Sequence, residues 1–278
     1  MRERPEPYDG ISTVRACQLL SLTRSLVYRP SKQKPPVLDA LVQEVKDVTA
    51  EFDSYGYRRT LGEVLLRGLS ASRGQVTEIM REHGLLQDTN RTGKRTVWDK
   101  SLKDAQNLTR DTRPAWTDEV WVADVTEVRA VKKRVFVAAV TDVYSRKVVG
   151  LAVSGRNDTE LTLSALVSAF ASRRPGAGLI HHSDRGCNYT SHAYTRMLEG
   201  AHALRSYSDK GRPTQNAFAE SLFSRYKVEE AGRKVYADIA HAARATRRYF
   251  ELYNTRRLHS SLGLKSPDQF EREMKTSP

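Results

Sequence analysis

Residues 119–128 read EVWVADVTEV, and this stretch decides the fold because it describes a strand with an acidic residue at its centre. Its four valines supply the β-branched content that is typical of strands. An ionised carboxylate inside a strand is costly unless it is paired or bound to a metal. The stretch therefore indicates a functional role for Asp124.

Two further carboxylates stand where a fold can aim them at the same point. Asp184 follows the short strand-like run 179–183 and precedes the loop 185–188, so we expect it at the C-terminal end of a strand. Glu220 lies in a stretch, 216–230, whose apolar residues recur with the period of a helix. At about 100° per residue, Glu220 and Lys227 come out nearly aligned on this helix.

The chemistry of such a set is that of a metal site. Carboxylates from two strands and one helix can hold a pair of magnesium ions, which prefer oxygen ligands. The ions would activate a water or a sugar hydroxyl and stabilise the leaving oxygen, and Lys227 would hold a phosphate nearby. Asp124, Asp184 and Glu220 therefore predict a metal-dependent site that cuts nucleic acid.

Other polar residues receive different assignments. Glu229 and Glu230 are roughly 14 Å further along the same helix at 1.5 Å per residue, too far to share a metal with Glu220. The setting of Asp142 favours a turn that orients Arg146. The two histidines at 181 and 182, just before Asp184, are expected to have a structural role and no role in acid-base catalysis, since metal-bound oxygen already supplies the nucleophile.

Composition agrees with a nucleic-acid partner. The 46 Lys and Arg exceed the 33 Asp and Glu, which gives a net charge of +13, and such an excess suits phosphate binding through counterion release. A ribosomal or regulatory protein would also fit this charge. With only two cysteines, no zinc-ligand spacing, no secretory leader and no long apolar run, we expect no membrane association and a reducing bacterial cytoplasm, at the nucleoid.

The N-terminal third predicts helices over 37–52, 60–67 and 72–83, with a turn at 68–70 between the last two. This is the pattern of a helix-turn-helix, with Val76, Ile79 and Met80 facing inward. The outward residues of its last helix would be Arg73, Gln75 and Arg81. A smaller copy is expected at 14–20 and 23–28. The alternative is that these helices only pack and never touch bases.

The remaining segments carry candidate DNA contacts. Residues 87–114 are expected to form a basic linker, and 206–215 a loop in which Lys210 and Arg212 grip DNA. Asn216 is the candidate cap of the helix that carries Glu220 and a further DNA contact. A long helix over 236–258 would turn Tyr249, Phe250 and Tyr253 inward and place five arginines on its polar surface: Arg244, Arg247, Arg248, Arg256 and Arg257.

Five motifs in order carry a resemblance to a known family. They are the runs 121–128 (WVADVTEV), 141–150 (TDVYSRKVVG), 182–191 (HSDRGCNYTS), 216–221 (NAFAES) and 253–267 (YNTRRLHSSLGLKSP), and the segment 55–59 (YGYRR) matches as well. With these motifs the chain resembles the transposases of the insertion-sequence family numbered three, whose catalytic domain is similar to retroviral integrase.

The resemblance implies an α/β, ribonuclease H-like integrase core, a mixed sheet of about five strands flanked by helices, after an all-α helix-turn-helix region. It implies that Asp124, Asp184 and Glu220 are the catalytic residues and bind two Mg²⁺, with Mn²⁺ as a substitute, and that Lys227 matches the family's basic residue. The implied reaction is cleavage at a transposon end followed by strand transfer of the freed 3′ hydroxyl into target DNA.

The expected organisation is a helical DNA-binding region at 1–86, a linker at 87–114, the catalytic core at 115–230 and a basic C-terminal helix and tail at 231–278. Expected partners are double-stranded DNA at transposon ends and targets, further copies of the chain on DNA, and an upstream-frame protein or fusion. The alternatives are a structure-selective nuclease of the same fold and a non-catalytic, domesticated DNA-binding protein.

Overall fold

The structure is a computed structural model that describes residues 13–19, 39–86, 106–110, 112–131, 133–209 and 213–276. The chain divides into two compact units, Met1–Asp39 and Ala40–Pro278. The first contains helix α1 (Thr13–Leu19), which corresponds to the helix predicted at 14–20. The helix predicted at 23–28 lies outside the described residues. Within the described ranges, no helix has both the length and the apolar character that crossing a membrane requires.

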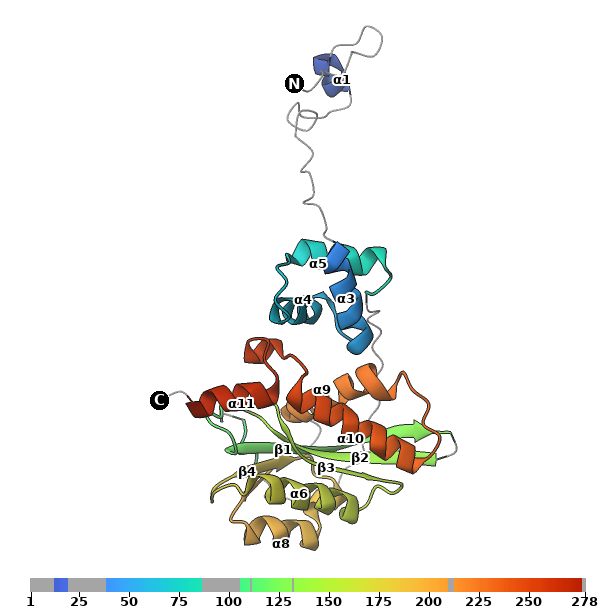
Figure 1. Cartoon of the computed structure of the whole chain (residues 1–278). Helices are drawn as coiled ribbons and strands as arrows, with labels where there is room; N and C mark the ends of the chain where they lie inside the picture. The colour runs from blue at the N-terminus through green and yellow to red at the C-terminus, as the bar shows by residue number, and fades with distance from the viewer. Residues whose placement is uncertain are drawn as a thin grey trace. The chain divides into compact units, whose positions relative to one another are not determined.

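The second unit contains a sheet of five strands, as predicted (Figure 1). Their order across the sheet is β3-β2-β1-β4-β5, with β1 in the middle. Strands β1, β2 and β3 are antiparallel neighbours, whereas β4 and β5 run parallel to β1. The bounds are β1 (Val120–Ala130), β2 (Lys133–Asp142), β3 (Val148–Ser154), β4 (Ile180–Ser183) and β5 (Leu204–Tyr207).

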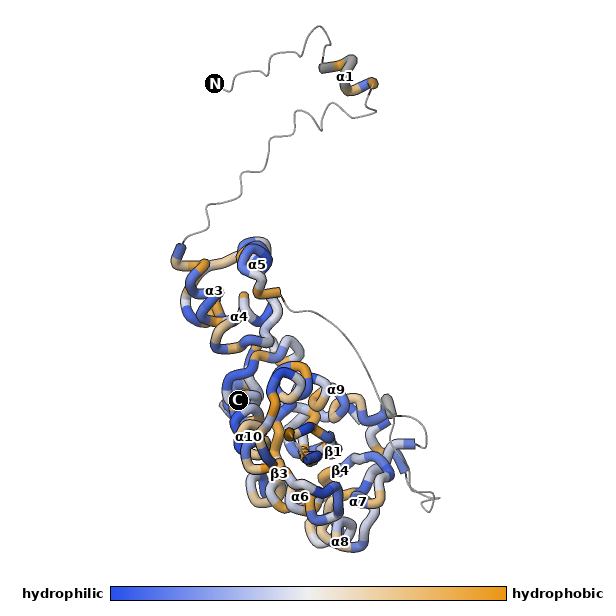
Figure 2. The backbone as a smooth tube through the Cα atoms, turned by 90° about the vertical axis from the view of Figure 1, so that its right-hand side faces the viewer, coloured by the Kyte–Doolittle hydropathy of each residue, from blue (hydrophilic) through white to orange (hydrophobic). Residues whose placement is uncertain are grey.

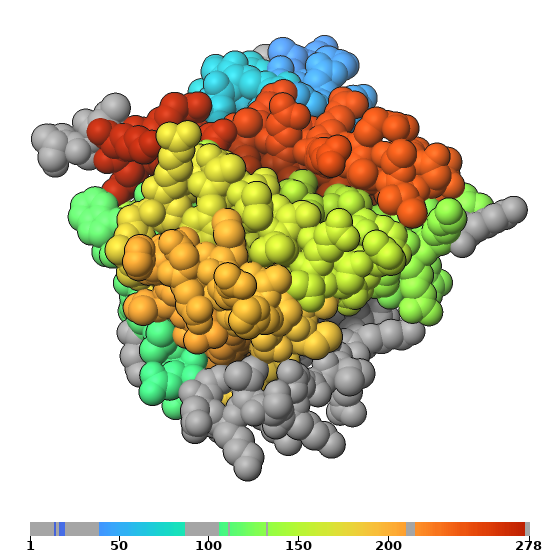
Figure 3. All heavy atoms as spheres, turned by 90° about the horizontal axis from the view of Figure 1, so that it is seen from below, coloured from blue at the N-terminus to red at the C-terminus, as the bar shows by residue number. Residues whose placement is uncertain are grey.

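Helices cover both faces of this sheet, and successive residues of β1 serve the two faces in turn. Trp121 and Ala123 pack in the core beneath α6 (Thr159–Arg173), α7 (Cys187–Thr190) and α8 (His192–Gly200), the side shown in Figure 3. Val128 and Ala130 pack under α9 (Ala217–Tyr226) and α10 (Ile239–Thr255) on the other face. Asp124 is four residues before Val128, and residues an even number apart in a strand point to the same face of the sheet. Asp124 therefore lies on the face that α9 covers.

Three helices precede the sheet within this unit: α3 (Asp39–Glu51), α4 (Tyr57–Leu66) and α5 (Arg73–Glu82). They correspond to the helices predicted there, and Figure 2 shows hydrophobic and hydrophilic stretches alternating along α3 and α4. Val76, Ile79 and Met80 are buried in their shared core, as predicted. Gln75 differs from the prediction, because its side chain accepts a hydrogen bond from the Ser72 amide (2.9 Å) in a capping box.

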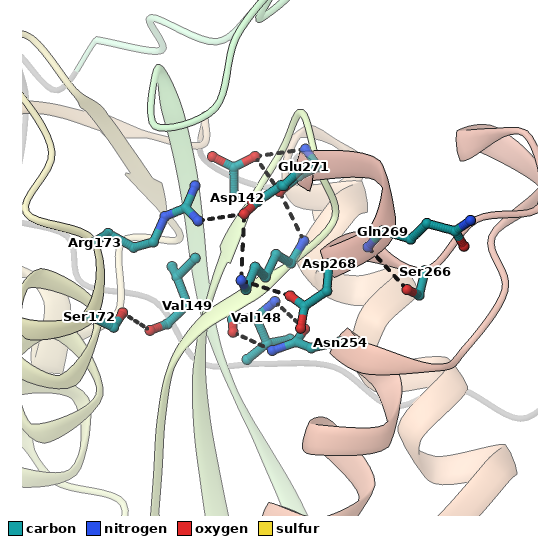
Figure 4. A network of polar contacts seen from close by, with 12 residues as sticks. Asp142, Val148, Val149, Ser172, Arg173, Asn254, Ser266, Asp268, Gln269 and Glu271 are labelled. Atoms are coloured by element: carbon teal, nitrogen blue, oxygen red, sulfur yellow. Dashed lines mark hydrogen bonds and ion pairs between the residues drawn. The ribbon is translucent and has the colours of Figure 1, made fainter. Parts of the chain in front are cut away.

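The C-terminal motif ends in the short helix η3 (Ser260–Leu262) and in α11 (Pro267–Thr276), which polar contacts hold against the β2–β3 turn (Figure 4). Glu271 accepts a hydrogen bond from Arg173 at 2.7 Å and lies 3.5 Å from Lys147. Asn254 of α10 bonds both the amide (2.9 Å) and the carbonyl (2.8 Å) of Val148. These contacts place the C-terminal motif beside the start of β3.

The glycine that closes the motif at 141–150 has a packing role. A Cβ at Gly150 would meet the backbone carbonyl of Ala165 and would lie 2.7 Å from Ala169 Cβ, because α6 crosses β3 there without a gap. A Cβ at Gly200 would meet nothing within 4 Å.

We expect Gly150→Ala to lower the free energy of unfolding by about 3 kcal/mol, because the added methyl would push α6 away from β3. Gly200→Ala is the matched control and should stay within about 0.5 kcal/mol of the parent. Urea denaturation of the three proteins measures both values. Equal midpoints for the two variants would contradict the packing role of Gly150.

Candidate active site

Two of the predicted carboxylates are brought together by strand register. Strand β4 pairs in parallel with β1, and Val122 lies opposite His182. Asp124 lies two residues beyond Val122 in β1, and Asp184 lies two residues beyond His182, just past the end of β4. The two carboxylates are close enough for the charge of Asp184 to raise the pKa of Asp124. Asp184 follows the last residue of β4 directly, as the sequence predicts.

Each aspartate is held by a backbone amide. Asp124 Oδ1 accepts a hydrogen bond from the amide of Val125 at 2.8 Å. Asp184 Oδ1 accepts one from the amide of Gly186 at 2.9 Å. A Cβ at Gly186 would lie 2.9 Å from the same carboxylate oxygen, so glycine keeps this side of Asp184 open.

Glu220 is carried to the aspartates by the apolar side of α9. Ala219, Leu222 and Phe223 are buried against the sheet, and Ala219 packs with Val122 of β1. Glu220 lies in the first turn of α9 with its side chain exposed. The helix therefore presents this carboxylate beside β1.

Asn216 holds the start of this helix in a way that differs from the prediction. It stands at the cap position, but its side chain makes no capping hydrogen bond. Its amide Nδ2 instead donates to the carbonyl of Ala123 at 3.2 Å, and the residue is 4% exposed. The predicted cap is wrong because the side chain bonds strand β1, next to Asp124.

Electrostatics links the three carboxylates with Lys227. Burial raises the pKa of Asp124 to about 7, with further increases from Asp184 and Glu220, while Lys227 lowers it. Burial also raises the pKa of Asp184 and that of Glu220. The charge of Lys227 thus acts on the carboxylate cluster, although no ion pair of Lys227 appears in the described ranges.

Oxygen-only donors suit a hard divalent cation, and the raised pKa values of the three carboxylates come mainly from burial. The side chains do not converge fully: among the described residues, no three acidic, histidine or cysteine side chains form a group that holds a metal ion. Glu220 is the exposed member of the set.

The helix that carries Glu220 changes geometry at Lys227. After the short helix η1 (Pro213–Asn216), α9 ends at Tyr226, and residues Lys227–Ala231 form a π-helical turn, η2. The predicted helix to residue 230 is therefore not α-helical throughout. The amide of Gly232 bonds the carbonyl of Lys227 at 2.7 Å, and a Cβ there would lie 2.5 Å from that oxygen.

This π-helical turn turns Glu229 into the interior, where it forms a buried ion-pair network. Arg257 donates to Glu229 through Nη2 (2.6 Å) and Nε (2.8 Å). Arg59 donates from the segment before the sheet (2.9 Å), and Tyr249 Oη donates from α10 (2.8 Å). Arg257 is 6% exposed, so its prediction as part of a polar helix surface is wrong.

The sequence excluded Glu229 as a metal ligand but did not indicate this role in an ion pair. The available signal for such a role was two consecutive arginines in each of two motifs, at 58–59 and at 256–257. Burial raises the pKa of Glu229, but the hydrogen bonds and charge of Arg257, aided by Arg59, outweigh it and lower the pKa to about 2.

His181 and His182 are structural, as predicted. His181 Nε2 lies 3.0 Å from the hydroxyl of Tyr194, and His182 Nδ1 lies 2.8 Å from that of Ser206. Burial lowers the pKa of His181 to about 3 and that of His182 to about 4. Both rings are therefore neutral near pH 7.

Asp142 accepts hydrogen bonds from Ser145 (2.7 Å), which confirms its predicted turn role.

The residues predicted to contact DNA lie in separate parts of the chain, and the structure describes only some of them. Arg73 and Arg81 are exposed on α5, and Arg73 stacks over the ring of Tyr57 at 4.8 Å. Lys227 is exposed beside the carboxylate cluster. Lys210 and Arg212 lie outside the described residues.

The sequence is similar to those of known proteins, both in the core and over most of the length of the chain. Family models described as "Integrase core domain" match residues 116–213 and 204–267. The "Transposase for insertion sequence element IS629" of Shigella sonnei is 34% identical and the match covers 84% of this chain and 79% of the relative. The "Insertion element IS600 uncharacterized 31 kDa protein" of Shigella sonnei is 34% identical over 91% and 96%. The "Transposase for insertion sequence element IS904" of Lactococcus lactis is 31% identical over 88% and 98%.

A solved structure described as "Structure of the HTLV-2 integrase catalytic core domain in complex with magnesium (dimeric form)" matches with a TM-score of 0.41 and 17% identity. The match covers 57% of this chain and 99% of that chain.

We expect Arg257→Ala to cost about 3 to 5 kcal/mol of unfolding free energy, because Glu229 would remain charged and buried without its main partner. The neighbouring Arg256→Ala is the matched control. Arg256 is 44% exposed in its ion pair with Glu63, so its loss should cost below about 1 kcal/mol. Chemical denaturation measures both, and equal losses would refute the buried network.

The same carboxylate predicts a pH dependence. The pKa of Glu229 is about 2 in the folded chain and 4.5 ordinarily, so its stabilising contribution is complete above pH 4.5 and disappears as the pH falls toward 2. At 1.36 kcal/mol per pKa unit this amounts to about 3 kcal/mol. Unfolding free energies measured across that window should fall more for the parent than for Glu229→Gln, and parallel curves would contradict the assignment.

Proposed function

Since this chain belongs to the integrase-core transposases of the insertion-sequence family numbered three, we propose that Asp124, Asp184 and Glu220 bind the divalent metal with which it cuts and joins DNA. The chain is an enzyme of DNA transposition. The observation that carries the site proposal is the placement of Asp124 and Asp184 at the ends of one stretch of strand pairing, with Glu220 on α9 beside them. Burial, with the nearby charges of Asp184 and Glu220, raises the pKa of Asp124 to about 7.

The metal proposal follows from the donors. Three carboxylates with no matched positive charge favour Mg²⁺, two ions in our proposal, and Mn²⁺ would substitute because it also accepts oxygen ligands. When bound, the ions supply Lewis-acid stabilisation and an activated oxygen nucleophile.

In this proposal the residues of the chain hold the metal and the DNA in place for the reaction. Asp124 of β1 and Asp184, just after β4, would hold the metal from the sheet, and Asn216 fixes the start of α9 beside them. Lys227, exposed near the cluster, would bind a DNA phosphate as a point charge. The reaction in our proposal is hydrolysis at a transposon end followed by attack of the 3′ hydroxyl on target DNA.

We propose that the helices before the sheet bind DNA, with Arg73 and Arg81 on the exposed side of α5 as phosphate contacts. The division into a DNA-binding region at 1–86, a linker at 87–114, a core at 115–230 and a C-terminal segment remains part of this proposal. So do assembly of several copies on the DNA ends, a fusion to an upstream frame, and action at the bacterial nucleoid.

The experiment incubates the chain, alone and fused to its upstream frame, with labelled element ends and Mg²⁺. We expect Glu220→Gln to reduce nicking and joining by more than about a hundredfold, since a metal ligand matters more than its outer shell. Glu127→Gln removes an exposed carboxylate from β1 and should leave the activity unchanged.

Thermal unfolding with and without Mg²⁺ supplies a readout besides activity. The ion should stabilise the parent and Glu127→Gln but not Asp124→Asn, because a ligand that binds only the folded state raises its stability. Joining by Glu220→Gln at the parent rate, or no nicking or joining by either the chain alone or the fusion, would end this proposal.

A further inference from the structure

A hollow of about 310 Å³ lies against α9, on a different side of the helix from Glu220. Phe218, Ser221 and Arg225 line it from α9 with the spacing of a single helix side. Its other walls come from the end of β2 with the turn that follows and from the C-terminal motif: Thr141, Asp142, Val143, Arg146, Tyr253, His259 and Ser261. Three of the five sequence motifs thus meet at one surface hollow.

The hollow holds two arginines without a carboxylate partner. Neither Arg146 nor Arg225 forms an ion pair or a hydrogen bond within the described part of the chain. The Asp142 carboxylate also lines the hollow, but it accepts hydrogen bonds from Ser145 (2.7 Å) and the Asp118 amide (2.6 Å). Its charge is already engaged, so the hollow presents a net positive surface.

Two donors in the wall are left unused. Arg146 Nε and Thr141 Oγ1 are buried, and neither has a hydrogen-bond partner. A buried donor without a partner costs about 1 to 3 kcal/mol. Both atoms therefore keep unused hydrogen-bonding capacity in residues that line the hollow.

Arg146 is held in place for such a role. It adopts a left-handed backbone conformation with φ of 64° in the turn after β2, which is uncommon for a residue with a side chain. Its guanidinium carbon lies 4.2 Å from the centre of the Phe218 ring, which is 45% exposed. The turn and the ring together hold the guanidinium in the wall of the hollow.

We propose that this hollow binds a backbone phosphate of the DNA that the transposase cuts or joins, an inference that rests on the proposed function. Guanidinium groups match phosphate oxygens in two-pronged hydrogen bonds, and Ser221 and Ser261 add hydroxyl donors. Ser221 follows Glu220 directly, so their Cα atoms are about 3.8 Å apart. The duplex that reaches the carboxylates would extend around α9 to the hollow.

The test measures binding of the full chain to a labelled DNA duplex by fluorescence anisotropy, in EDTA so that no cleavage occurs. We expect Arg146→Ala/Arg225→Ala to weaken binding about tenfold and to reduce the salt dependence by about one counterion. The control is Arg196→Ala, an exposed arginine of α8, which should change binding less than about twofold.

A second arm separates this pocket from general screening. Inorganic phosphate should compete with the duplex more strongly than chloride at equal ionic strength, and this difference should vanish in the double variant. Since Arg225 is exposed, Arg225→Glu should fold normally and should weaken binding at least as much as Arg225→Ala, which decides the case if Arg146→Ala misfolds.

The proposal is overturned if Arg225→Glu and the double variant bind DNA like Arg196→Ala. Joining activity with Mg²⁺ is measured separately. Pocket-dependent binding without any joining would remove the proposed function and keep the phosphate site, whereas joining with pocket-independent binding would remove the phosphate site alone.

Discussion

The buried carboxylate of Glu229 is the constraint on which the arrangement around α9 depends. It receives Arg257 from the C-terminal motif in two hydrogen bonds, and Arg59 from the segment that precedes the sheet. A charge at this depth is tolerated only when its lone pairs are used, so the three segments can pack in one way. The π-helical turn after α9 is what directs Glu229 toward these partners.

Helix α9, which carries Glu220, is consequently fixed at both ends by polar contacts. Asn216 joins its start to the carbonyl of Ala123, and Glu229 anchors the turn beyond its end. Between these points Glu220 stands beside Asp124 and Asp184, whose mutual repulsion and burial work against the fold. A rigid frame thus holds in place a cluster of like charges that would separate if its supports were soft. The buried ion pairs supply the rigidity, and the carboxylates supply the charge. This is why buried ion pairs lie around a carboxylate cluster that has no ion pair of its own.

Much of the fold and of the proposed triad was predictable from local patterns. The valines around Asp124 predict β1, the period of Phe218, Leu222 and Tyr226 predicts α9, and the position of Asp184 after a short apolar run predicts a strand end. The buried ion network was not predicted: the arginine pairs at 58–59 and 256–257 mark possible partners, but no local pattern tells an inward charge from a solvated one. The cap at Asn216 failed for a related reason: a strand carbonyl distant in sequence competes for its amide.

The five-stranded α/β class, the family and the three candidate carboxylates follow from the sequence, because periodicity and motif order are properties of the chain. Folding alone brings Asp184 near Asp124, turns Glu229 into the interior and places Arg146 and Arg225 around one hollow. These facts depend on strand register and on which charges lose contact with water. Both are settled by packing between segments far apart in the sequence, where burial changes the cost of every unpaired charge.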